Sequence, residues 1–233
     1  IDGVPAASQG NTLLAPFSAG QEIACLAEPI DATGSGTPMP TQTLINNSSP
    51  SVDSVVLNPS SPITNDTITA TAILSDPDPF DSLVAHYEWH VVDASAGNTD
   101  SIVQSGPSNS LDGNSFFDKN DSVYVVVTAN DGIENSGELQ SANITIENAA
   151  PTNPIVTINA LPGPYNDATW VCTGTATDAD QSDTIQYTYL WSTGDTTSQI
   201  TLSGQTSPGE QIDCTVTAND GEVQVSNTAT SNM

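Results

Sequence analysis

Six aspartates form two copies of one short motif, and their spacing suits the binding of a cation. The motif reads Asp-x-Asp-x-x-Asp, and its members are Asp76, Asp78, Asp81, Asp178, Asp180 and Asp183. An Asn-Asp pair follows each copy, ending at Asp131 and Asp220. Ca²⁺ takes about six to eight oxygen ligands, which carboxylates, amides and backbone carbonyls supply. If the fold brings each motif to its Asn-Asp pair, the sequence predicts calcium sites, with Asn153 as a further ligand.

The same aspartates have a simpler interpretation. An Asp side chain accepts a hydrogen bond from the backbone two residues further on, which forms an Asx turn, and its charge keeps the protein in solution. Turn formation and calcium binding therefore both remain open on the sequence alone.

The charge balance of the chain restricts its partners. Its 233 residues include 28 acidic side chains and a single basic one, Lys119, for a formal net charge of −27. Nucleic acids and anionic membranes are polyanions and are not expected to bind such a surface. Salt or divalent cations would screen these carboxylates, so adaptation to a salty medium is another explanation for the acidic excess.

An internal repeat organises the sequence. Residues 67–78 align without gaps with residues 169–180, and a tryptophan follows each segment at the same distance, at Trp89 and Trp191. The hexapeptide Val-Thr-Ala-Asn-Asp-Gly also occurs twice, at 127–132 and 216–221.

Within the repeats, apolar residues alternate with the period of β-strands. Ile185, Tyr187, Tyr189 and Trp191 share one face of such a segment, and Leu190 is an apolar exception on the other face. About seven such runs per hundred residues, separated by Gly, Pro, Asn and Asp, are typical of two packed antiparallel sheets. We therefore expect an all-β chain of tandem immunoglobulin-like β-sandwiches.

The cysteines agree with this fold. Cys172 lies on the expected second strand, Trp191 on the third and Cys214 on the sixth. This order resembles the immunoglobulin fold, in which an inter-sheet disulfide packs against a buried Trp. The resemblance implies a Cys172–Cys214 disulfide, with two reduced thiols as the alternative. In the preceding repeat Ala70 and Val125 take these positions, so packing alone must hold that domain.

Linkers of the form Asn-x-x-Pro introduce the two repeats, at Asn47 and at Asn148. The expected domains are residues 1–47, 48–147 and 148–233.

The first of these units is expected to be incomplete. Residues 21–25 resemble residues 210–214, so we expect 1–47 to be the C-terminal half of an immunoglobulin-like domain whose N-terminal part is missing or supplied elsewhere. Residues 1–3 would lie just past the tryptophan of that domain. Cys25 would pair with a cysteine outside the chain, or else be a free or intermolecular thiol. Disulfides indicate an oxidising, extracellular compartment.

Several features together identify a wider family. They are the Asn-x-x-Pro linker, the Asp-x-Asp loop, a Tyr two residues before each Trp, the repeated hexapeptide, and Trp191 to Asp195, which echoes the PKD signature with Thr193 in place of Phe. Over nearly 190 residues the chain resembles the PKD-like and bacterial immunoglobulin-like repeats of large secreted surface proteins. Such repeats occur in adhesins, surface layers and filaments, and as spacers in secreted enzymes.

This topology places the aspartates at the domain junctions. The Asp motifs would lie between the second and third strands and the Asn-Asp pairs between the sixth and seventh, at the pole where the linker enters. The arrangement resembles cadherin-type arrays, in which junction calcium stiffens the string. Related repeats carry Asp-x-Asp-Gly-Asp, however, and residues 79–80 and 181–182 stand where that glycine would be. Without a cation the clustered carboxylates would repel one another and their pKa values would rise.

Other candidate sites are weaker. His86, Glu88 and His90 alternate on one strand and could bind zinc, although a solvent-facing strand also explains them. Tyr165 and Trp170 are the mild candidates for stacking on a sugar, and Trp170 has the inward parity of a core residue. No catalytic arrangement of side chains stands out. Glycosylation sequons occur at Asn46, Asn47, Asn65, Asn120 and Asn143.

The sequence thus predicts an extracellular structural protein that is not an enzyme. Its repeats would form or decorate a cell-surface layer, fibre or filament, with calcium stiffening the junctions. The expected partners are other copies of the chain or other surface proteins. The alternatives are an adhesin stalk that recognises glycans or other cells, and a spacer within a secreted enzyme.

Overall fold

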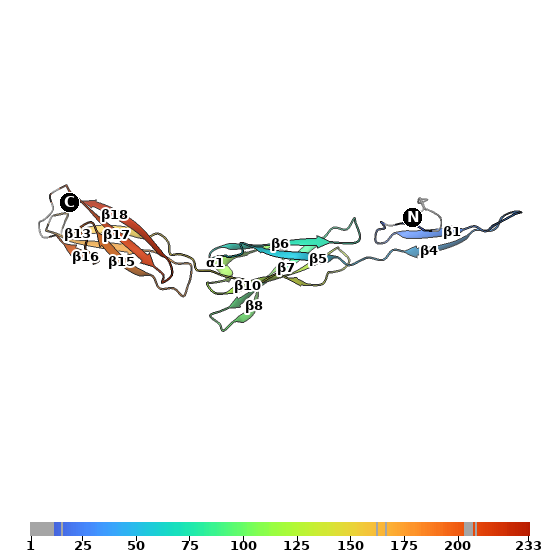
Figure 1. The fold of residues 1–233 in the computed structure, drawn as a ribbon, viewed down its shortest axis with the longest axis horizontal. Helices are drawn as coiled ribbons and strands as arrows, with labels where there is room; N and C mark the ends of the chain where they lie inside the picture. The colour runs from blue at the N-terminus through green and yellow to red at the C-terminus, as the bar shows by residue number, and fades with distance from the viewer. Residues whose placement is uncertain (1–11, 15, 162, 166, 203–206, 208) are drawn as a thin grey trace.

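Three β-structured units lie end to end (Figure 1). The computed structural model describes residues 12–14, 16–161, 163–165, 167–202, 207 and 209–233. Residues 1–3, expected just past a tryptophan of the first unit, fall outside the described residues.

The middle unit is a sandwich of two antiparallel sheets. One sheet has the order β5-β6-β9, and the other has the order β11-β10-β7-β8 with β12 also paired to β10. Its elements are β5 (Ser51–Asn58), β6 (Thr67–Ser75), β7 (Val84–Asp93), β8 (Thr99–Gly106), β9 (Ser110–Asp112), α1 (Gly113–Phe116), β10 (Ser122–Asn130), β11 (Leu139–Gln140) and β12 (Ile144–Thr145). The Asp112 side chain caps the short helix by accepting a hydrogen bond from the Asn114 N–H.

The C-terminal unit repeats this plan with fewer strands. Its sheets have the orders β13-β14-β16 and β15-β17-β18, and all pairs are antiparallel. The strands are β13 (Ile155–Leu161), β14 (Thr169–Thr175), β15 (Gln186–Trp191), β16 (Gln199–Thr201), β17 (Gln211–Asn219) and β18 (Gln224–Asn232). The expected all-β fold of tandem immunoglobulin-like sandwiches is confirmed.

The alternation of apolar residues fills the space between the sheets. Along β10 every second side chain is buried, from Val123 to Ala129, and β17 follows the same pattern. Trp89 and Trp191 lie at the centres of the two cores. Each indole satisfies its N–H by donating to a backbone carbonyl, Trp89 to Ser108 at 3.1 Å and Trp191 to Thr197 at 2.8 Å. These cores hold the loops at both poles in fixed positions.

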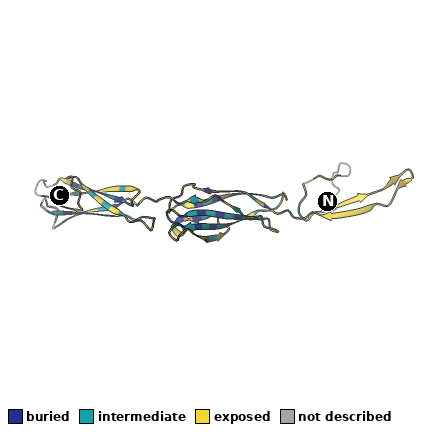
Figure 2. Ribbon diagram, turned by 60° about the horizontal axis from the view of Figure 1, so that its bottom comes forward, coloured by how far each residue is buried: buried dark blue, intermediate teal, exposed yellow. Residues whose placement is uncertain are grey.

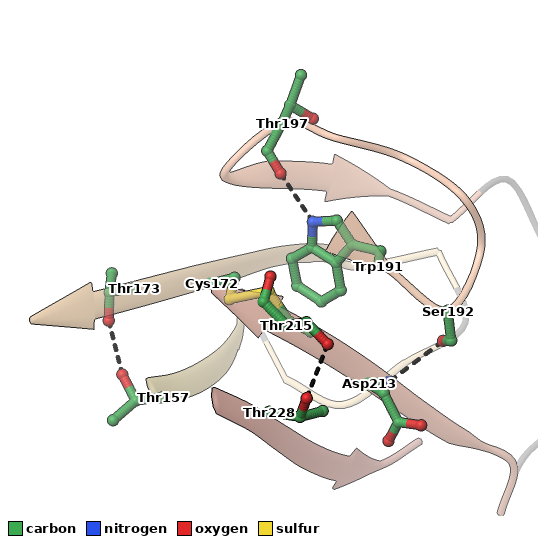
Figure 3. The surroundings of a disulfide bond; sticks show 10 residues. Thr157, Cys172, Thr173, Trp191, Ser192, Thr197, Asp213, Thr215 and Thr228 are labelled. Carbon is green, nitrogen blue, oxygen red and sulfur yellow. Dashed lines mark hydrogen bonds between the residues drawn. A yellow bond between two sulfur atoms is a disulfide. The ribbon is translucent and has the colours of Figure 1, made fainter. Parts of the chain in front are cut away.

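A disulfide joins the two sheets of the C-terminal unit. Cys172 on β14 and Cys214 on β17 are bonded, with their Cα atoms 6.4 Å apart. Figure 3 shows the bond beside the ring of Trp191. In the middle unit Ala70 and Val125 are both buried at the corresponding positions. That unit is therefore held together without a covalent link between its sheets.

The N-terminal unit is a hairpin with little burial (Figure 2). Strands β1 (Glu22–Ala27) and β4 (Met39–Leu44) pair along their length, and β2 (Ile30–Asp31) pairs with β3 (Gly34–Ser35). The exposed apolar side chains are Leu26, Ile30, Met39 and Leu44. Cys25 is exposed and has no disulfide partner within the described chain. Its pairing with a cysteine outside the chain stays a prediction.

Candidate metal centres at the domain junctions

The fold gathers the aspartates into two equivalent clusters. Carboxylate oxygens of three residues lie within 4.8 Å of one another in each cluster. The first cluster comprises Asp76, Asp81 and Asp131, and the second comprises Asp178, Asp183 and Asp220. In the first cluster, the β6–β7 loop and the residue after β10 supply the carboxylates. In the second cluster, the β14–β15 loop and the residue after β17 supply them. Three carboxylates on a rigid pole can supply half of the oxygens that Ca²⁺ requires.

The Asx turns form, and they leave room for the predicted cation binding. The first aspartate of each motif forms an Asx turn, in which Asp76 Oδ1 accepts from the Asp78 N–H at 2.7 Å and Asp178 Oδ1 accepts from the Asp180 N–H at 3.0 Å. The turn uses one carboxylate oxygen only. The other oxygen, Oδ2 of Asp76 and of Asp178, is buried without a hydrogen-bond partner. Turn formation therefore leaves a ligand atom free in each cluster.

The central aspartate of each motif anchors the linker, and its role as a metal ligand stays a prediction. Asp78 Oδ2 accepts from the Ser48 N–H at 2.8 Å, and Asp180 Oδ2 accepts from the Ala149 N–H at 2.8 Å. Thr64 of the middle unit also donates to Asp180 Oδ1. Burial raises the pKa of Asp180, and these hydrogen bonds oppose the rise. Neither carboxylate belongs to the two three-residue clusters that the described residues form.

A linker asparagine reaches each cluster, but it is the first residue of the Asn-x-x-Pro motif. Asn47 Nδ2 donates to Asp131 Oδ2 at 2.9 Å, and Asn148 Nδ2 donates to Asp220 Oδ2 at 3.0 Å. Asn153, the predicted ligand, is exposed, since Pro151 and Pro154 are the residues that this stretch buries. The repeated Asn-x-x-Pro motif therefore marks the asparagines that contact the clusters, and the role of Asn153 as a ligand stays a prediction.

The first cluster has more negative charge than its hydrogen bonds can satisfy. Burial, and then the carboxylates of Asp78, Asp76 and Asp131, raise the pKa of Asp81. The Asn47 amide and the backbone N–H of Glu134 lower the pKa of Asp131, so that group stays ionised. Buried atoms without a partner are Asn47 Oδ1, Asp76 Oδ2 and Asp81 Oδ2. Three orphaned oxygens at one point are acceptors that lack a cation or a donor.

The pKa of Asp81 has a defined consequence for stability. Because the folded state binds this proton more tightly than the unfolded chain, the stabilising contribution is present at low pH and is lost as the pH rises through the folded-state pKa. Without a cation, the ionised carboxylate of Asp81 therefore destabilises the fold at neutral pH.

The second cluster contains an ammonium group that the sequence analysis did not place there. Lys119 Nζ lies 2.7 Å from Asp183 Oδ2 and 3.0 Å from Glu222 Oε1. It also donates to Asp183 Oδ1 at 2.9 Å and to Asn148 Oδ1 at 3.0 Å. The hydrogen bonds to Asp183 raise the pKa of Lys119, against the effect of burial, so the group is charged. The only basic residue of the chain thus lies at this junction.

His86, Glu88 and His90 are not among the groups of three potential metal ligands that the described residues bring together. His86 Nε2 lies 3.0 Å from Ser105 Oγ. His90 stacks on Tyr124, with ring centroids 4.4 Å apart, and its Nδ1 lies 3.1 Å from Asp100 Oδ1. Burial, followed by the hydrogen bond to Asp100, raises the pKa of Tyr124 to about 12. The two imidazoles therefore have separate partners on the neighbouring strands.

The remaining candidates differ in accessibility. Trp170 is buried in the core of the C-terminal unit, so it cannot stack on a sugar, whereas Tyr165 is exposed. Among the sequon asparagines, the amide of Asn47 is bonded to Asp131. The exposed ones are Asn46, Asn65, Asn120 and Asn143. Among the described residues, no helix is long and apolar enough to cross a membrane.

Comparisons with known proteins give no family, and the solved structures that they find are only distantly similar. No family model and no curated protein matches the sequence. A two-domain fibronectin type III segment of chicken tenascin is 12% identical, with a TM-score of 0.40 over 78% of this chain and 99% of that one. The chicken interferon gamma receptor alpha chain is 11% identical, with a TM-score of 0.44 over 80% and 99%.

A third similar solved structure comprises several fibronectin-type domains named FN1–FN3. The FN1–FN3 domains of chicken CNTN1 are 13% identical, with a TM-score of 0.33 over 92% of this chain and 77% of that one. The fold itself is established by the strand order and by the two separate cores. The chain is a tandem array of immunoglobulin-like β-sandwich domains.

Proposed function

We propose that this chain is an extracellular structural protein whose first domain junction binds calcium and whose junctions hold the array as a stiff rod. The observation that carries the proposal is the first junction cluster, in which Asp76 and Asp81 each bury a carboxylate oxygen that has no donor. A divalent cation would satisfy these oxygens together with Asp131, and would remove the repulsion that raises the pKa of Asp81.

The linkers are suited to a rod because they are fixed to the domains that follow them. Asp78 and Asp180 hold the backbone of Ser48 and Ala149 at the entry pole. At the second junction the Gln181 N–H also donates to Asp118 Oδ2 of the middle unit at 3.2 Å. Such short, anchored connections restrict bending, which favours a structural role over a flexible tether.

Composition and chemistry favour a location outside the cell. A disulfide is typical of secreted domains. Millimolar calcium is also typical of extracellular fluids, where weak sites of this class are occupied. The repeats agree with membership of the PKD-like and bacterial immunoglobulin-like group.

The N-terminal hairpin favours a partner made of β-strands. Its apolar side chains Leu26, Ile30 and Met39 are exposed, and an isolated two-stranded hairpin is only marginally stable in water. We infer that another β-structure, from a further copy or from another surface protein, covers this hairpin.

The proposal predicts a calcium-dependent rise in the melting temperature of the middle domain. At a calcium concentration 100-fold above the dissociation constant, binding contributes about 2.7 kcal/mol, which raises the melting temperature of a domain this size by roughly 10 °C or more. Asp81→Asn should abolish the rise. It should also melt slightly higher than the wild type without calcium, since it removes a repelled carboxylate. The melt is followed by circular dichroism in calcium and in excess chelator.

The matched control is Glu138→Gln, which changes the same charge on an exposed side chain of the same domain. This variant should keep the full calcium response. A rise that magnesium or matched ionic strength reproduces, or that survives in Asp81→Asn, would mean that calcium acts by general screening and would refute the junction sites.

A further inference from the structure

The loop that carries Lys119 has a counterpart at the first junction. Before β1 and before β10 the backbone makes the same set of hydrogen bonds. In the first pair, Gly20 N donates to Ile45 O and Asn120 N donates to Ile146 O, both at 2.9 Å. In the second, Ile45 N donates to Gln21 O at 2.8 Å and Ile146 N donates to Asp121 O at 2.9 Å. In the third, Gln21 N donates to Ser18 O at 3.2 Å and Asp121 N donates to Asp118 O at 3.1 Å. A side chain caps each loop in the same way: the Ser18 N–H donates to Gln21 Oε1, and the Asp118 N–H donates to Asp121 Oδ2. Ala19 therefore occupies the position of Lys119.

At the second junction, the position that Ala19 takes in the first loop carries the positively charged side chain of Lys119. The Lys119 ammonium contacts both oxygens of Asp183, one oxygen of Glu222 and the amide oxygen of Asn148, all within 3.0 Å. These are oxygen ligands converging on one positive charge. The side chains of Lys119 and Asp183 are 11% and 10% exposed, so water screens the pair little.

At the first junction the equivalent acids have no such partner. Asp81 takes the place of Asp183, and its Oδ2 is buried without a donor. Asn47 takes the place of Asn148, and its Oδ1 is likewise unpartnered. Ile133 replaces Glu222, which removes one carboxylate but supplies no positive charge. Two oxygens that bind the ammonium, on Asp183 and Asn148, thus have counterparts on Asp81 and Asn47 that are left without a partner, whereas Oδ2 of the first aspartate of the motif is unpartnered at both junctions.

We propose that Lys119 is a built-in cation that fills the second junction site, so that only the first junction takes up a free divalent cation. The inference rests on the proposed function for the first site but makes a separate claim about the second. The chain would then have one calcium-dependent junction and one calcium-independent junction. A string of such domains would bend or stiffen at selected joints as calcium changes.

Isothermal titration with calcium chloride tests the proposal through the number of ions bound per chain. The wild type should bind one. Lys119→Ala copies the residue that the first loop uses. It should bind two, because it frees the oxygens of Asp183, Glu222 and Asn148 beside the carboxylates of Asp178 and Asp220. Ala19→Lys makes the reciprocal change and should bind none. Near-ultraviolet circular dichroism of the buried tryptophans checks that each variant is folded.

Each pattern of results has a distinct meaning. A wild type that binds two ions, or a Lys119→Ala variant that still binds one, overturns the role of Lys119 and leaves the first site standing. If the wild type binds no calcium and Lys119→Ala binds one ion, the role of Lys119 is supported and the proposed function at the first junction is refuted. No binding by either protein overturns both.

Discussion

Replacement of Trp89 by alanine is expected to destabilise the middle domain by about 3–5 kcal/mol, because it removes a large buried side chain and leaves a cavity. Trp89 is fully buried among residues from both sheets. Its indole N–H is also bonded to the Ser108 carbonyl, which would lose its donor. A loss of this size is a large part of the total stability of a small domain. Urea unfolding followed by far-ultraviolet circular dichroism measures it.

An exposed apolar residue of the same domain is the control. Ile102 on β8 is 56% exposed, and Ile102→Ala should change the free energy of unfolding by less than about 0.5 kcal/mol. Equal effects of the two substitutions would show that Trp89 does not hold the sheets together.

Loss of the disulfide is expected to destabilise the C-terminal domain by about 4 kcal/mol, since the bond closes a loop between residues 42 positions apart. The double variant Cys172→Ala with Cys214→Ala should show this loss. The middle domain, whose equivalent residues are Ala70 and Val125, should melt unchanged. Differential scanning calorimetry resolves the two transitions.

Reduction of the wild type provides an independent check of the same bond. A thiol reductant should lower the C-terminal transition to that of the double variant and leave the other transition in place. If reductant has no effect, or if both transitions fall together, the bond does not stabilise the C-terminal domain on its own.

Strand periodicity and spacing predicted the fold well. The alternation on β15 and β17 identified the buried face correctly, because one face of each sheet must be covered. The order of Cys172, Trp191 and Cys214 also implied the bonded pair that the structure contains. Local pattern was sufficient here because burial repeats with the period of the strand.

The division of roles among the aspartates could not be predicted in the same way. Asp76, Asp78 and Asp81 are chemically identical, and only the path of the linker shows that Asp78 binds the Ser48 backbone. Whether a carboxylate oxygen is free for a cation depends on which N–H groups lie nearby, and the order of residues does not give that. Turn formation and cation binding were also treated as alternatives, whereas Asp76 can serve both with different oxygens.

The position of Lys119 was missed for a related reason. It contacts Asp183, which lies 64 residues away and in another domain. Such a contact depends on how two domains meet, and no motif within either domain encodes it. The one available signal was the alignment of the two loops, which pairs the only basic residue of the chain with Ala19.

The central claim is that calcium fixes the first junction, and ¹⁵N relaxation of the whole chain tests it most directly. In calcium, the β1–β4 hairpin and the middle domain should tumble with one shared rotational correlation time. Excess chelator should release the hairpin to tumble faster, while the middle and C-terminal domains stay coupled through Lys119 and serve as the internal reference. A hairpin whose correlation time is the same in calcium and in chelator would contradict the account.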